Sequence, residues 1–221
     1  LYFFFLGRAY KYGNLSVVYP VARGLGVLLI PIFGFLLLKE LMIFWAAFGV
    51  VVVLAGIVFV GISTNTGKSE IVGFNPMTWI KNKGLMFAVL TGITIGSYSI
   101  LDKQGVIHVN PLLYMFFLSL GGGTGMFVII RREYKLPEFA IGWKRHWPSI
   151  VIGGALQFTA YSMVLTAFQL SPVSYVGPFR EISIAVGVIM GSLILKERMS
   201  KLRVVGAVLI LVGAVLIAVV P

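Results

Sequence analysis

The chain has 221 residues and a formal net charge of +11, yet only 11% of its residues are charged and 59% are hydrophobic. Soluble domains carry roughly 25% charged residues, so this chain lacks the polar surface that a water-facing globular protein needs. The basic residues lie in short connections between long apolar runs, which is typical of membrane loops and excludes a nucleic-acid surface. Helices lying flat on a membrane are excluded as the main architecture, because most runs are apolar all round.

Taken in chain order, residues 1–10 are predicted to be the end of a helix that starts before this sequence. Seven complete membrane spans follow, all helical because a helix satisfies its own backbone hydrogen bonds in lipid. A polar stretch at 63–83, containing Gly and Asn-Pro, is predicted to connect two halves. The predicted spans are 16–38, 44–62, 84–101, 112–130, 150–170, 174–195 and 204–220.

The two halves of the chain share a tandem pattern whose spacings agree except for one extra residue before the Lys-Glu pair of the first half. The glycines in each copy are seven residues apart and are predicted to lie on a helix-packing stripe. If each full copy has an odd number of spans, the copies insert in opposite orientations around a midplane cavity. The matching positions are Ala9, Pro20, Lys39-Glu40, Gly49 and Gly56, then Ala167, Pro178, Lys196-Glu197, Gly206 and Gly213.

Three charged residues lie deep within predicted spans, where a charge costs at least about 2.5–3.5 kcal/mol. Arg23 is in the first half, and Arg180 and Glu181 are in the matching span of the second. Neighbours on a helix point about 100° apart, so Arg180 and Glu181 are expected to pair poorly with each other, and Glu181 could reach Arg23 instead. They are candidates for binding an anionic substrate, with Glu181 able to exchange a proton. A structural ion pair, or an arginine reaching the headgroups, is the alternative.

Other polar groups within spans are candidates for lining the same cavity. Tyr19, Tyr98, Gln157 and Tyr161 are predicted to contact substrate, although helix-to-helix hydrogen bonding explains such residues equally well.

Two further features concern movement. Pro20 and Pro178 each remove a backbone hydrogen bond near the charged residues and are predicted hinges, with a plain kink as the alternative. Asp102 and Lys103 are predicted to end their span, either as a gate at the cavity mouth or as an interfacial ion pair.

The sequence shows no pattern for catalysis or for a cofactor. It contains no cysteine, and its two histidines, His108 and His146, lie in predicted loops, so no metal site is expected. The glycines between Gly121 and Gly125 lack the lysine of a phosphate-binding loop. No nucleophile lies beside a base at a recognisable spacing, so the chain is not predicted to be an enzyme.

The stretches YGNLSVVYPVARG, LLLKE and GVVVVLAG resemble the EamA-like repeat of the drug/metabolite transporter superfamily. The segment AFQLSPVSYVGPFREISIAVGVIMGSLILKERMSKLRVVGAVLILVGAVLIA resembles a second copy. The resemblance implies ten helices in two inverted five-helix units, of which this sequence lacks the first two and most of the third. Residues 1–62 would then belong to the first repeat, 63–83 to the connector and 84–221 to the second repeat.

The implied function is secondary-active export or exchange of a small organic metabolite by alternating access, as a multi-pass protein of the plasma membrane. The basic pocket favours an anionic substrate such as an amino acid or carboxylate. No cofactor or nucleic-acid partner is expected, and both a monomer and a homodimer fit. A non-transporting membrane scaffold, or an integral membrane enzyme acting on lipid-linked substrates, is the alternative.

The membrane orientation stays open at this point. Fourteen of the 18 Lys and Arg residues lie in connections on one side, which the positive-inside rule makes cytoplasmic. That rule places the C-terminus outside, whereas the superfamily is generally drawn with both termini in the cytoplasm.

Overall fold

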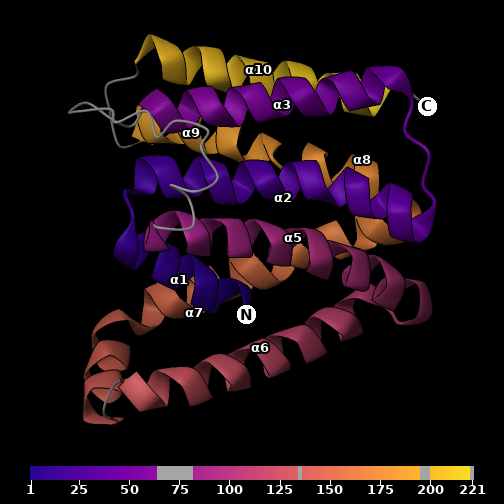
Figure 1. Ribbon diagram of the computed structural model, residues 1–221. Helices are drawn as coiled ribbons and strands as arrows, with labels where there is room; N and C mark the ends of the chain where they lie inside the picture. Colours follow the sequence, from indigo (N-terminus) through magenta and orange to yellow (C-terminus); the bar gives the residue numbers. More distant parts are fainter. Residues whose placement is uncertain (64–81, 134–135, 195–199, 220–221) are drawn as a thin grey trace. The chain divides into compact units, whose positions relative to one another are not determined.

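A computed structural model of the chain describes residues 1–63, 82–133, 136–194 and 200–219 (Figure 1). Within these ranges all regular structure is helical, and seven segments are long and apolar enough to cross a membrane. The predicted all-α, multi-pass membrane architecture is therefore confirmed. Most of the predicted connector 63–83, together with Lys196-Glu197, lies outside the described residues. The helices are α1 (Tyr2–Tyr12), α2 (Leu15–Leu38), α3 (Phe44–Ser63), α5 (Lys83–His108), α6 (Pro111–Glu133), α7 (Leu136–Leu170), α8 (Val173–Phe179), α9 (Ile182–Ile194) and α10 (Lys201–Val219).

Several predicted helix ends are wrong. α5 continues to His108 instead of ending at 101, and α7 starts at Leu136, so that both histidines lie in helices. The predicted span 174–195 is two helices, α8 and α9. Polar residues mark where a chain leaves hydrocarbon, but a helix satisfies its own backbone in water as well as in lipid and continues past that point.

The helices form two compact units, residues 1–101 with 172–221, and residues 102–171. We call them the first and the second unit. The first unit brings together helices from both halves of the tandem pattern. It contains α1, α2, α3, most of α5, α8, α9 and α10.

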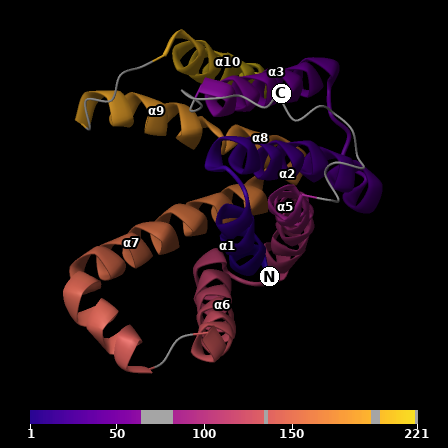
Figure 2. The same cartoon turned by 60° about the vertical axis from the view of Figure 1, so that its left-hand side comes forward.

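In the first unit, α3 and α10 lie side by side with their backbones in contact (Figures 1 and 2). A methyl group built on Gly49 would lie 2.8 Å from the Gly213 carbonyl oxygen, and one built on Gly56 would lie 2.7 Å from that of Gly206. The low-numbered glycine of one helix thus meets the high-numbered glycine of the other, so the helices run antiparallel. These contacts place the four glycines where α3 and α10 approach each other most closely, and small residues allow such an approach.

The second pair of matching helices, α2 and α8, also runs antiparallel. Gly34 in α2 lies against Ser174 at the start of α8, whereas Ile30, one turn earlier in α2, lies against Gly177 near the end of α8. Both pairs of matching helices therefore run in opposite directions, as two oppositely inserted copies require.

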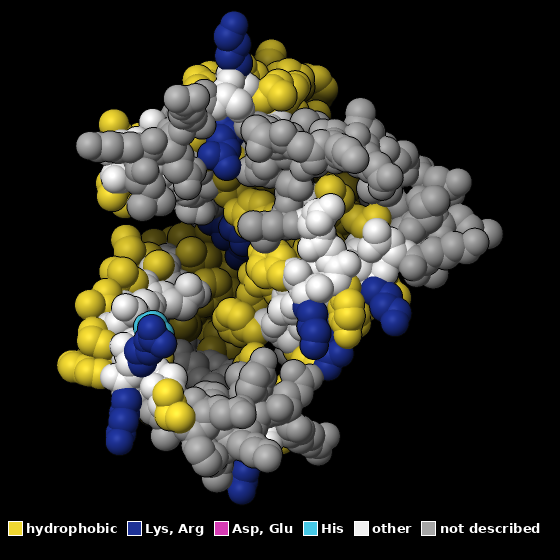
Figure 3. Space-filling model, turned by 90° about the vertical axis from the view of Figure 1, so that its left-hand side faces the viewer, with side chains coloured by type: hydrophobic (Ala, Val, Ile, Leu, Met, Phe, Trp, Pro, Cys, Tyr) yellow, Lys and Arg dark blue, Asp and Glu magenta, His cyan; other side chains and the backbone are white. Residues whose placement is uncertain are grey.

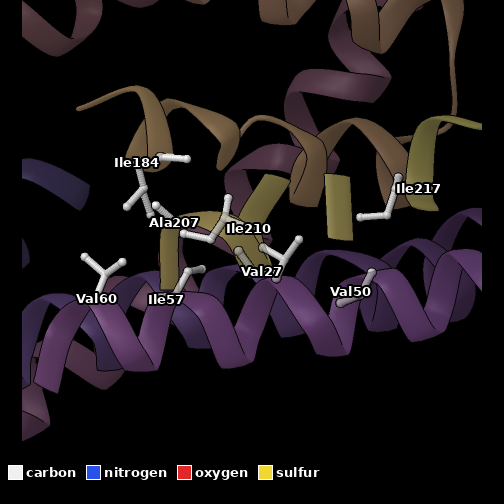
Figure 4. Close-up of a cluster of buried hydrophobic side chains, with 10 residues drawn as sticks. Val27, Val50, Ile57, Val60, Ile184, Ala207, Ile210 and Ile217 are labelled. Carbon is white, nitrogen blue, oxygen red and sulfur yellow. The ribbon is translucent and has the colours of Figure 1, made fainter. Parts of the chain in front are cut away.

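A cluster of buried aliphatic side chains joins α2, α3, α9 and α10 (Figure 4). Val27 of α2 and Ile184 of α9 contribute to it beside residues of α3 and α10. Many apolar side chains also lie on the outer surface, and Figure 3 shows hydrophobic patches beside several Lys and Arg side chains on one face. On α6, for example, Phe116, Phe117 and Leu120 are each more than half exposed. Apolar side chains on the inside and the outside alike are what a protein surrounded by lipid requires.

In the second unit, Asp102 and Lys103 bind different partners. Asp102 is buried and accepts hydrogen bonds from the hydroxyls of Tyr114, at 3.1 Å, and Tyr161. Lys103 donates to the carbonyl oxygens of Phe168 and Ser171. The prediction that the two residues end their span is wrong, because α5 continues for five residues beyond Lys103. These bonds tie α5 to α6 and α7, and a gating role stays a prediction.

The Lys-Glu pair of the first half joins α2 to α8. Lys39 adopts a left-handed conformation (φ 55°), which ends α2. The carboxylate of Glu40 then accepts hydrogen bonds from the backbone N–H groups of Val173 (3.0 Å) and Ser174 (2.9 Å) and from the Ser174 hydroxyl (2.6 Å). A carboxylate at this point satisfies unpaired N–H groups of the first turn of α8 and complements the helix dipole.

We expect Glu40→Ala to lower the free energy of unfolding by about 1–2 kcal/mol, the usual range for loss of a helix cap. Unfolding of the purified protein in detergent measures the loss. Ser174→Ala and the double variant complete a mutant cycle, and a coupling energy near zero would contradict the assigned contact.

Candidate functional site

The candidate site lies where the α8–α9 span is interrupted. α8 ends at Phe179 and α9 begins at Ile182, which leaves Arg180 and Glu181 in a turn between them. The turn is closed by short-range backbone bonds, from Glu181 N–H to the Pro178 carbonyl (3.2 Å) and from Ile184 N–H to that of Glu181 (2.9 Å). Pro178 lies just before the turn and has no N–H to donate to the carbonyl one turn earlier, so α8 lacks one hydrogen bond of a regular helix.

Glu181 pairs with two arginines in this turn. Its Oε2 lies 2.9 Å from Nη2 of Arg23 in α2, and its Oε1 lies 3.4 Å from Nε of Arg180. The expected pair with Arg23 is confirmed. Arg180 and Glu181 were expected to pair poorly, but they form an ion pair at 3.4 Å, because the 100° separation applies only to a continuous helix and these residues occupy the turn.

We call Arg23, Arg180 and Glu181 the ion cluster. Their side chains are largely buried, and their formal net charge is +1. The side chain of Glu181 is 1% exposed, against 11% for Arg180 and 21% for Arg23. The Nε of Arg23 is buried and has no hydrogen-bond acceptor among the described residues. Buried donors are nearly always satisfied in proteins, so this N–H is a group that a bound anion can use.

Tyrosines from three helices surround the ion cluster. Tyr19, one turn before Arg23 on α2, lies beside that arginine. The guanidinium of Arg180 lies 5.9 Å from the ring centre of Tyr98 on α5, and Tyr2 of α1 packs edge-on against Tyr98, with ring centres 5.9 Å apart. An aromatic ring over a guanidinium holds the cation without neutralising it.

The structure thus brings together the predicted residues Arg23, Arg180, Glu181, Tyr19 and Tyr98. Sequence reasoning missed Tyr2, because the residue at the matching position of the second half, Ala160, is not polar and gave no sign of a shared site.

The remaining predicted residues lie elsewhere. Gln157 and Tyr161 are on α7 in the second unit, where Gln157 is exposed and Tyr161 binds Asp102. Of the two predicted hinges, Pro178 precedes the interruption, whereas α2 is continuous through Pro20, whose ring packs on Gly61 of α3. Hinge motion at either proline stays a prediction.

Comparison with known proteins identifies the family. The model of the EamA-like transporter family matches residues 82–219. The chain belongs to the EamA-like transporter family. The match includes the α8–α9 interruption and the helices that flank it.

Curated relatives of this EamA-like chain carry transporter names. It is 28% identical over 137 residues to the probable magnesium transporter NIPA6 of Arabidopsis thaliana, a match that covers 62% of this chain and 35% of the relative. It is 27% identical to the uncharacterized inner membrane transporter YhbE of Escherichia coli K12, over 60% of this chain and 42% of the relative. The match therefore spans less than half the length of these relatives. No solved structure matches the chain.

Proposed function

We propose that the protein carries a small organic anion across the plasma membrane as a secondary transporter, and that the anion binds at the ion cluster. One observation carries the proposal: two arginines from antiparallel matching spans converge on a single buried carboxylate at a helix interruption. Interrupted helices between inverted repeats are typical of substrate sites in secondary transporters. The inner-membrane relative from Escherichia coli supports the location.

The charges of the cluster favour an anion. Two guanidiniums against one carboxylate leave one positive charge in excess, and guanidinium groups bind carboxylates through paired N–H donors. The N-terminus of α9 begins at Ile182, directly after Glu181, and adds the positive end of its helix dipole to the same place. An anion placed there offsets the cost of keeping both arginines within a membrane span.

A divalent cation is the second candidate, because one relative is named a probable magnesium transporter. Mg²⁺ is bound by carboxylates and water oxygens in octahedral geometry. At the ion cluster it would meet two guanidiniums and one carboxylate, so its entry is electrostatically opposed. Among the described residues no group of three or more His, Cys, Asp or Glu converges elsewhere. We therefore favour the anion.

We expect Arg180→Gln to weaken anion binding about tenfold to a hundredfold, because a charge-assisted hydrogen bond is worth roughly 1.5–3 kcal/mol. Thermal-shift binding of pyruvate, succinate and L-glutamate to the full-length protein, followed by uptake into proteoliposomes, measures the effect. Arg203→Gln, which removes a positive charge from the first turn of α10, is the matched control.

If Arg180→Gln binds the three anions as tightly as the wild type, Arg180 is not part of the binding site. Stabilisation of the wild type by Mg²⁺ and by none of the three anions would overturn the proposed function in favour of a cation.

A further inference from the structure

We infer that Glu181 is a built-in counter-ion that takes up a proton when the substrate anion replaces it on Arg23 and Arg180, so that anion and proton bind together. The inference rests on the proposed function, because it assigns the coupling ion of the same site.

Glu181 balances the charge of both arginines at the place where a substrate anion would bind. Its two carboxylate oxygens each face a different arginine, at 2.9 Å from Nη2 of Arg23 and 3.4 Å from Nε of Arg180. A substrate carboxylate that binds both guanidiniums competes with Glu181 for their positive charge, and the Nε of Arg23 offers it a donor that Glu181 does not use. Glu181 is thus positioned as a tethered competitor, with the same functional group as the proposed ligand.

Binding of an anion changes the charge balance of the site. If Glu181 stayed ionised beside a bound monoanion, two carboxylates would share one buried site, and like charges at such distances strongly favour protonation of one of them. A proton from water that forms an O–H bond on a Glu181 oxygen, as its ion pairs to the arginines break, removes that repulsion. The cluster then carries +1 both before and after binding. On substrate release the O–H bond breaks, the proton returns to water, and the ion pairs re-form.

The described groups that face the ion cluster are of other chemical types than Glu181. The facing ionisable groups on α1, α2, α5 and the turn are tyrosines and arginines, whose side chains are ordinarily neutral and positively charged, respectively, at neutral pH. Helices α3 and α9 contain no ionisable residue, and those of α10, Lys201 and Arg203, are in its first turn. Among these described residues, Glu181 is the one carboxyl group. The facing groups are Tyr2, Tyr10, Tyr19, Arg23, Tyr98 and Arg180.

The test uses pyruvate, whose carboxylate stays ionised from pH 5 to 8, and the full-length protein in detergent. We expect the dissociation constant of the wild type to rise with pH, by up to tenfold per pH unit. In weakly buffered solution we expect about one proton to be taken up per pyruvate bound. Glu181→Gln keeps the shape of the side chain but cannot ionise, so it should bind pyruvate at pH 8 as tightly as the wild type does at pH 5, without proton uptake.

Glu40→Gln is the matched control, because it neutralises a carboxylate of the first unit that lies outside the ion cluster, and it should keep the pH slope of the wild type. Pyruvate binding by the wild type without proton uptake would overturn the inference and leave the proposed function standing. A pH slope that persists in Glu181→Gln, or is lost in Glu40→Gln, would overturn it as well. If Glu181→Gln does not fold, the number of protons that the wild type takes up per pyruvate bound tests the inference without the variant. If the wild type binds none of pyruvate, succinate and L-glutamate, both the proposed function and this inference are wrong.

Discussion

Glu181→Ala is expected to lower the free energy of unfolding by about 3–5 kcal/mol, because it leaves buried arginine charges without their counter-ion. The side chain of Glu181 is 1% exposed, and those of Arg23 and Arg180 are mostly buried around it. Solvent therefore cannot replace the lost carboxylate. Denaturant unfolding of the purified protein, or its melting temperature in detergent, measures the loss.

A second variant separates the loss of charge balance from the loss of side-chain volume. When Arg23, Arg180 and Glu181 are all replaced by Met, no charge remains to be compensated, and most of the stability should return, because a buried ionic network adds little over well-packed apolar residues. The triple variant should nevertheless bind none of the anions. A Glu181→Ala protein as stable as the wild type would show that the two arginines are solvated, contrary to their burial.

Gly56→Leu is expected to disrupt the first unit. A methyl group at this position would lie 2.7 Å from the Gly206 carbonyl oxygen and 2.9 Å from the backbone nitrogen of Ile210. Both neighbours are backbone atoms, so no side chain can rotate away, and α3 and α10 must separate along their length. We expect a loss at or above the upper end of the roughly 1–3 kcal/mol that overpacking costs, seen as aggregation or a large fall in melting temperature.

Gly121→Leu is the matched control, because it makes the same change within a span of α6, where nothing lies within 4 Å of the added carbon atom. It should insert and melt like the wild type. Equal melting temperatures for Gly56→Leu and Gly121→Leu would contradict the close backbone contact of α3 with α10.

The two pairs of matching helices are held together by different kinds of contact. The backbones of α3 and α10 touch at paired glycines, an arrangement that allows little sliding. In contrast, α2 and the α8–α9 span are joined by polar contacts, at the ion cluster and at the Glu40 cap, whose partners can exchange.

The sequence by itself determined the membrane class, the seven spans and the matching positions of the two halves. These features depend on local composition and spacing, since length and hydrophobicity suffice to specify a helix in lipid. The stripe of glycines on each of the helices α3 and α10 was also predictable, because a seven-residue spacing places small side chains on one helix face. Arg23, Arg180 and Glu181 could be selected as candidates because charge within a span is costly and therefore uncommon.

Only the tertiary structure decided how the candidates are arranged. The interruption at Arg180 and Glu181 allows neighbours in sequence to pair, which a continuous helix would not. Tyr2 joins the site, and Tyr161 binds Asp102, through contacts between residues far apart in the sequence. Such contacts depend on which helices pack together, and helical periodicity carries no information about the partner across a helix interface.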